Sequence, residues 1–178
     1  MALKATIYKA EIQVSDMDRN HYQNYSLTLA RHPSETDERM LLRLVAFALN
    51  ADDQLSFCRG ISTDDEPDLW QMSLSDEIEL WIELGQPDEK RLRRACGRAR
   101  QVIVYPYAER SADIWWQQNG ADFQRFGNLS VVKLTVQGGA PLSALAQKTM
   151  NLSCSIQEGQ IWLSDESLNI TLEQTAWK

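Results

Sequence analysis

The sequence predicts an α+β protein in which a mixed β-sheet carries helices. Residues 78–84 alternate between apolar and polar side chains, which is typical of a strand. Pro87 and Asp88 follow at once, and both suit the first turn of a helix. The tail, residues 151–172, consists of short apolar runs separated by turn signals such as Gly159, which predicts a β-meander.

Length and composition favour one domain over residues 1–178, with an ordinary globular core. The chain has 178 residues, a formal net charge of −7, 43% hydrophobic residues and 24% charged residues. No window approaches the ~20 apolar residues of a membrane span, and the first residues lack the apolar run of a signal peptide. We therefore expect a cytoplasmic protein that has no contact with a membrane. Three widely spaced cysteines (Cys58, Cys96 and Cys154) suit buried free thiols.

The N-terminal part predicts a hairpin followed by a helix. Residues 5–14 and 22–30 alternate in the manner of two strands joined by a polar loop. The helix is expected to open at residues 33–37, with Ser34 as a plausible cap, and its apolar positions recur at helical spacing up to Ala48.

The remaining elements follow from shorter patterns. Strands are expected at 55–59, 101–107 and 129–136, helices after Pro87 and at 111–118 and 141–148, a short helical turn at 122–126, and meander strands at 151–157, 161–164 and 168–172.

Charge changes sign abruptly in the middle of the chain. Residues 60–89 hold ten of the 25 acids and no Lys, Arg or His, whereas residues 90–100 hold six of the 18 bases. The six bases fall opposite an apolar stripe that contains Leu92 and Ala95, as in any amphipathic surface helix. The same bases also suit a track for the phosphates of a polyanion. Both interpretations stay open at this point.

Two acids near this boundary suit a divalent cation. Mg²⁺ prefers one or two carboxylates together with water and substrate phosphate. Glu79 and Glu83 lie about 13 Å apart along one strand, too far to share an ion. Asp68 is a better partner for Glu83, because the intervening residues are long enough to form a hairpin. Trp81, between the two glutamates, is expected to be a half-buried sheet residue, with base stacking as the alternative.

These residues resemble two known patterns. Glu66-Pro67-Asp68 and Glu83-Leu84-Gly85, the second at the end of an apolar strand, are similar to the PD-(D/E)xK nuclease motif. The segments 65–70, 80–89 and 161–165 resemble the bacterial YaeQ family, and this resemblance extends over the whole chain. It implies a restriction-endonuclease-like mixed sheet flanked by helices, with a core at about 36–107, an extra N-terminal hairpin and a C-terminal β-meander.

The nuclease resemblance also implies roles for particular residues. Asp68 and Glu83 would be catalytic metal ligands, and the carbonyl of Leu84 a further ligand. The motif lysine falls on Gly85, which cannot replace it. Gln86 could orient a water molecule, and either Lys90 or Arg94 could reach back from the following helix.

Two functions follow from these expectations. The first is an Mg²⁺- or Mn²⁺-dependent phosphodiesterase acting on nucleic acid. It would hold phosphate with Lys90, Arg91, Arg94 and Arg98. The alternative is a non-catalytic protein that binds nucleic acid or another protein, as the missing lysine and the charge of −7 suggest. No Gly-rich phosphate loop is present, so no nucleotide cofactor is expected.

Overall fold

Strands dominate the structure, which is a computed structural model that describes residues 4–59 and 63–178. The elements are β1 (Thr6–Asp16), β2 (His21–Arg31), α1 (Asp37–Leu49), β3 (Leu55–Phe57), β4 (Leu69–Met72), β5 (Ile78–Leu84), α2 (Glu89–Arg98), β6 (Ala99–Tyr105), α3 (Glu109–Phe123), β7 (Leu129–Gln137), the 3-10 helix η2 (Leu142–Leu145), β8 (Thr149–Gln157), β9 (Gln160–Ser164) and β10 (Asn169–Ala176). Among residues 4–59 and 63–178, no helix is long and apolar enough to cross a lipid bilayer.

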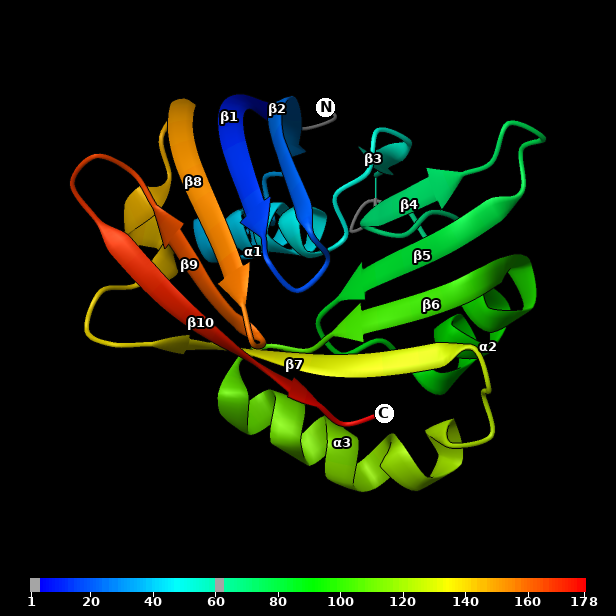
Figure 1. The fold of residues 1–178 in the computed structure, drawn as a ribbon. Helices are drawn as coiled ribbons and strands as arrows, with labels where there is room; N and C mark the ends of the chain where they lie inside the picture. The colour runs from blue at the N-terminus through cyan, green and yellow to red at the C-terminus, as the bar shows by residue number, and fades with distance from the viewer. Residues whose placement is uncertain (1–3, 60–62) are drawn as a thin grey trace. The chain divides into compact units, whose positions relative to one another are not determined.

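The chain divides into two units. Unit 1 consists of Met1–Ala51 and Val136–Glu173, and unit 2 consists of Asp52–Thr135 and Gln174–Lys178. Each unit has its own group of hydrogen-bonded strands and its own helices (Figure 1). A single domain over residues 1–178 stays a prediction.

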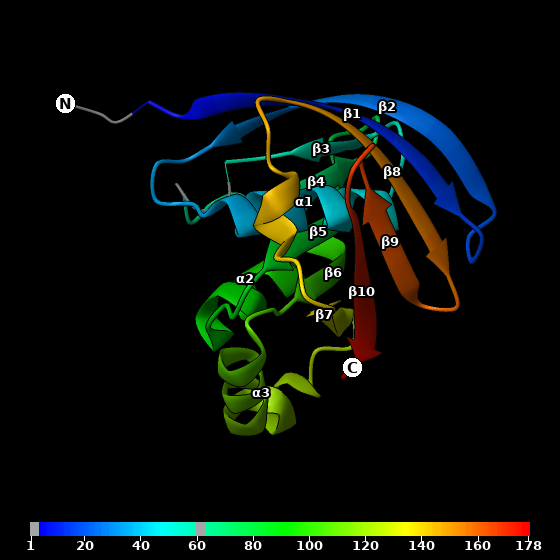
Figure 2. The ribbon, with the colours of Figure 1, turned by 90° about the vertical axis from the view of Figure 1, so that its left-hand side faces the viewer.

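Unit 1 contains the N-terminal hairpin of β1 and β2. Its strands follow the order β2-β1-β8-β9-β10. β1 pairs with β2 in antiparallel register and with β8 in parallel register, where Lys9 lies opposite Thr149. Alternate residues of β1, such as Ile12 and Val14, are buried, so one face of this sheet belongs to the core. Helix α1 packs against β1, β2 and β8 on that side (Figure 2).

The cap of helix α1 lies two residues later than the expected one. The cap is Thr36, whose hydroxyl accepts a hydrogen bond from the amide of Arg39 at 3.1 Å, rather than Ser34. Ser34 instead bonds through its hydroxyl to the ring of His32 at 2.6 Å. Both hydroxyl residues suit a cap chemically, and local competition for the Ser34 side chain decides between them.

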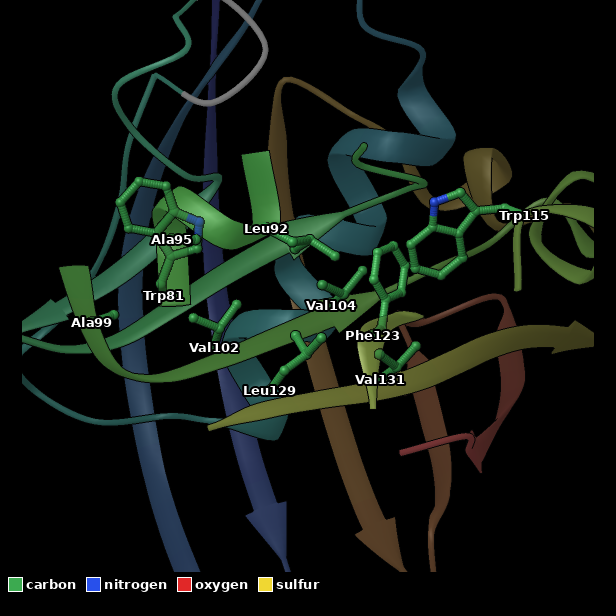
Figure 3. Close-up of a cluster of buried hydrophobic side chains, with 10 residues drawn as sticks. All are labelled: Trp81, Leu92, Ala95, Ala99, Val102, Val104, Trp115, Phe123, Leu129 and Val131. Atoms are coloured by element: carbon green, nitrogen blue, oxygen red, sulfur yellow. The ribbon is translucent and has the colours of Figure 1, made fainter. Parts of the chain in front are cut away.

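Unit 2 contains the strands β7-β6-β5-β4-β3 in that order. β5, β6 and β7 are parallel, with α2 connecting β5 to β6 and α3 connecting β6 to β7. Asp88 caps α2 by accepting a hydrogen bond from the amide of Arg91 at 2.8 Å, one position before the first turn in which the sequence placed it. Side chains from these strands and both helices form one apolar cluster (Figure 3), which consists of Trp81, Leu92, Ala95, Ala99, Val102, Val104, Trp115, Phe123, Leu129 and Val131.

The predicted restriction-endonuclease-like sheet flanked by helices is wrong. Ten strands follow one hydrogen-bonded order, β2-β1-β8-β9-β10-β7-β6-β5-β4-β3, and the described residues form only three α-helices. The hairpin and the meander are members of this order rather than additions to a central core. Helix α1, expected to flank the strands of the 36–107 core, instead belongs to unit 1 and packs on the hairpin and β8.

Several local expectations also differ from the structure. α3 is one continuous helix, Glu109–Phe123, where the sequence predicted a helix and a separate turn. The helix expected at 141–148 is the short η2, Leu142–Leu145. Strand β4 was not predicted, because its four residues are too few for alternation to be visible.

Candidate functional site

Asp68 and Glu83 come together in unit 2, on neighbouring antiparallel strands. Leu69 of β4 lies opposite Ile82 of β5, which places the preceding residue Asp68 across from Glu83. Both side chains are buried, with 2% and 4% exposure. The hairpin that the spacing of these two acids suggested is therefore present, and two carboxylates share one desolvated region.

Each carboxylate is held by groups of its own hairpin or of the following helix. The amide of Leu84 donates to Oδ2 of Asp68 at 2.8 Å. The indole Nε1–H of Trp81 and the Nε–H of Arg91 both donate to Oε1 of Glu83, each at 2.8 Å. These bonds fix the two acids in position before any ligand arrives.

The surroundings favour the neutral form of Glu83. Burial raises the pKa of this carboxyl from its ordinary value of 4.5 to about 7, and the negative charge of Asp68 adds to the effect. Arg91 and the Trp81 indole act in the opposite direction and only partly offset it. Perturbed acids of this kind are concentrated at functional sites, so the pair is the leading candidate.

Cys58, which directly follows β3, lies close enough to the same acids for their charges to act on its thiol. Its amide donates to the carbonyl of Asp68 at 2.9 Å. Burial, followed by the charges of Glu66, Asp68 and Glu83, raises the pKa of the thiol strongly. This neighbour was not predicted from the sequence, because Cys58 and Glu83 are 25 positions apart.

Several arginines of α2 contact the acidic segment 63–66. Arg91 donates to the carbonyl of Glu66 at 2.9 Å, and Arg98 donates to the carbonyl of Asp65 at 2.8 Å. Arg94 lies 3.7 Å from the carboxylate of Asp65. The sign change along the chain thus has a structural explanation, because acids and bases that are distant in sequence neutralise each other within unit 2. Their predicted role in phosphate binding is not tested by these contacts.

At the position of the motif lysine the chain has Gly85, which carries no charge and has an unusual backbone conformation. Gly85 has a φ of +96°, which favours glycine there. The side-chain amide of Gln86 donates to the carbonyl of Tyr107 at 2.5 Å, and this bond anchors Gln86 just after β5. The cation that bonds to Glu83 is Arg91, whereas Lys90 and Arg94 were the expected substitutes. Trp81 is 1% exposed, so it belongs to the core and its ring is closed to base stacking.

The donor chemistry of this pair fits a hard divalent cation. Within the part of the chain that the structure describes, no three His, Cys, Asp or Glu side chains are grouped closely enough to hold a metal ion. Mg²⁺ and Mn²⁺ do not need such a group, because one or two carboxylates completed by water and substrate phosphate are sufficient. Asp68 and Glu83 supply two carboxylates with one neighbouring arginine, and the Leu84 carbonyl is the predicted third oxygen.

The fold and this carboxylate pair define a mixed-sheet α+β protein with two buried acids on neighbouring strands. Residues 1–174 match the family model described as YaeQ protein. The chain belongs to the YaeQ family.

Known relatives are similar over nearly their whole length. "Uncharacterized protein YaeQ" from Escherichia coli (strain K12) is 52% identical, with 100% of this chain and 98% of the relative covered. The protein of the same description from Salmonella typhi is 51% identical, with the same coverage. The crystal structure of YaeQ protein from Xanthomonas axonopodis pv. citri has a TM-score of 0.92 and 47% identity over 97% of each chain. That of YaeQ protein from Pseudomonas syringae has a TM-score of 0.89 and 32% identity, covering 98% of this chain and 96% of the other.

Proposed function

We propose that this protein is a divalent-metal-dependent phosphodiesterase acting on nucleic acid, with Asp68 and Glu83 as the metal ligands. The observation that carries the proposal is the burial of two carboxylates side by side, where Glu83 bonds to one arginine. Keeping two like charges in a desolvated region costs free energy, and a cation shared by both removes that cost.

The residues around the pair have distinct tasks. The Leu84 amide and the Trp81 indole orient Asp68 and Glu83. A bound Mg²⁺ or Mn²⁺ would supply an activated water and neutralise charge on the phosphate. Arg91 supplies the positive charge that the motif lysine provides elsewhere. Gln86, whose side-chain amide bonds to Tyr107, would orient a water molecule at the end of β5.

A second candidate function is binding without catalysis. Gly85 stands where the motif has its lysine, and Arg91 and Arg98 are already bonded to carbonyls of the segment 63–66. A protein of this kind would retain the acidic centre as a structural or regulatory cation site. Its partner would be a nucleic acid or another protein.

Metal titration separates these ideas. We expect isothermal titration with Mn²⁺ and Mg²⁺ to give saturable binding that Asp68→Asn weakens at least tenfold. Asp65→Asn is the matched control, because Asp65 is an exposed acid on the neighbouring segment and its variant should bind the ions normally. Absence of binding at millimolar Mn²⁺ would overturn the proposal.

Cleavage assays then test turnover. Single- and double-stranded DNA and RNA should be cut in Mn²⁺ by the wild type and by Asp65→Asn, and should stay intact with Asp68→Asn. Metal binding and nucleic-acid binding without any cutting would instead support the second candidate.

A further inference from the structure

The exposed face of the unit 1 sheet is lined by uncharged polar side chains in register across four strands. Asn24 of β2 lies opposite Gln13 of β1, Gln13 lies opposite Ser153 of β8, and Ser153 lies opposite Ser164 of β9. Paired residues of a sheet share a face, so these amides and hydroxyls form one continuous row. A second row beside it consists of Ser26, Glu11 and Asn151.

This face is hollowed along β8. A cavity of about 410 Å³ is lined by residues of both rows, including Gln13, Asn24 and Asn151, and by the turn after β9. A second hollow of about 230 Å³ shares Asn151 and Asp165 with the first. The larger volume lies within the ~300–1,000 Å³ of typical small-molecule sites.

The charged residues that line the hollow are all acidic: Glu11, Asp165 and Glu166. The carboxylates of Glu11 and Asp165 accept hydrogen bonds from neighbouring residues. Glu11 accepts the hydroxyl of Ser26 at 2.6 Å. Asp165 accepts the amides of Ser167 and Leu168, each at 2.8 Å, and so holds the turn. Among the described residues that line the hollow, none is Lys or Arg. Anionic ligands are therefore disfavoured, while amides and hydroxyls remain as both donors and acceptors.

Aromatic side chains border the polar rows on the same face. Trp162 of β9 lies opposite Ser155 of β8, two positions along the strands from the pair of Ser153 and Ser164 and so on the same face. Tyr22 of β2 lies opposite Ser15 and is 59% exposed. An aromatic ring beside hydrogen-bonding groups offers a flat apolar plate against which the C–H face of a sugar ring packs.

We propose that this face of unit 1 binds a neutral oligosaccharide. The amide and hydroxyl rows match the hydroxyl groups of a linear sugar chain, Trp162 and Tyr22 match its apolar ring faces, and the missing bases exclude phosphorylated or acidic sugars. The proposal goes beyond the phosphodiesterase function, and its residues are different from Asp68, Glu83 and the residues of α2.

The test uses the full chain and neutral linear oligosaccharides of glucose and of N-acetylglucosamine, five units long. Binding is measured by isothermal titration and by amide chemical shifts in ¹⁵N-labelled protein. At least one of these sugars should bind, with shifts concentrated in β1, β8 and β9. Asn151→Ala and Trp162→Ala should each weaken binding at least fivefold. Gln157→Ala is the matched control, because Gln157 is exposed on the same strand outside both hollows, and should bind normally.

Three outcomes would overturn the proposal. The first is no binding of any of these sugars at 10 mM. The second is binding that Asn151→Ala and Trp162→Ala leave unchanged although both variants keep the wild-type spectrum. The third is binding of the polyamine spermine in the absence of sugar binding, which would assign the hollow to a cation. Because Asp68→Asn should leave sugar binding intact, this result is independent of the fate of the proposed metal site.

Discussion

Two buried glutamates each bond to an arginine eight positions further along the chain, but their surroundings differ. Glu35 in unit 1 is 3% exposed and accepts N–H groups of two arginines: Arg43 at 2.6 and 3.0 Å, and Arg39 at 2.8 Å. Glu83 in unit 2 is 4% exposed, bonds to one arginine and lies beside a second carboxylate.

The difference separates a structural ion pair from a candidate site. Glu35 has more positive charge around it than it carries, and its bonds to Arg39 and Arg43 hold it against α1. Glu83 has too little, so its pKa rises to about 7 and the charge of its site changes near neutral pH. Buried acids of similar exposure are thus distinguished by what faces them, which burial alone does not reveal.

The largest expected effect is in unit 1. Arg43→Met should lower the free energy of unfolding by about 3–5 kcal/mol, because it leaves Glu35 buried with only Arg39 as a partner. Urea denaturation followed by circular dichroism measures this loss. Arg93→Met is the control, since Arg93 is 62% exposed in its pair with Glu89 and exposed pairs contribute about 1 kcal/mol or less.

The corresponding substitution beside Glu83 provides a second measurement of the same kind. Arg91→Met should cost less than Arg43→Met below pH 7, because Glu83 can take up a proton when its arginine is lost. Equal costs for Arg43→Met and Arg93→Met would show that burial gives the Glu35 pair no special weight.

The second effect is a pH dependence that originates in Glu83. Its folded pKa of about 7 lies above the ordinary value of 4.5, so the folded state binds more protons between these two pH values. The free energy of unfolding therefore falls as pH rises through this window, by about 3 kcal/mol from this group alone. The contribution is largest below pH 4.5 and is lost above pH 7.

Denaturation at a series of pH values, with EDTA present, measures this component. Glu83→Gln should remove it, and Asp68→Asn should move its midpoint to lower pH. Glu79→Gln, on the same strand but partly exposed, should leave the curve parallel to that of the wild type. A Glu83→Gln curve that also runs parallel would contradict the raised pKa.

The smallest effect concerns the thiol beside the acids. Cys58 should react slowly with iodoacetamide, because burial and the charges of Glu66 and Asp68 keep it protonated. Asp68→Asn should accelerate its labelling about 2–5-fold, since one of the charges that raise its pKa is removed. Peptide mass spectrometry measures the rate, with Cys154 as the internal control. An unchanged rate would mean that Asp68 does not act on this thiol.

The sequence predicted the elements with strong local signals. The strand Ile78–Leu84 and the start of a helix directly after Pro87 are confirmed, because alternation and helix-start signals are decided within a few residues. The convergence of Asp68 and Glu83 was also expected, since it needed only a short hairpin.

The rest depended on contacts that no local pattern contains. The parallel pairing of Lys9 with Thr149 joins the two ends of the chain, so the predicted fold class failed where the hairpin and β8 meet. Similarly, the bonds of Arg91 to Glu83 and to the carbonyl of Glu66 could not be read from the sequence, and its role in phosphate binding stays a prediction. Helical periodicity tells which face an arginine occupies, and leaves open which acid lies opposite that face.

The parallel pair of β1 and β8 affects how the chain folds during its synthesis on the ribosome. β1 is synthesised before its neighbour β8, and nearly all of unit 2 lies between them in the sequence. During elongation β1 must wait with one edge open, while the strands and helices of residues 52–135 are already able to assemble. The N-terminal hairpin is thus the segment for which a nascent-chain chaperone has most reason to bind.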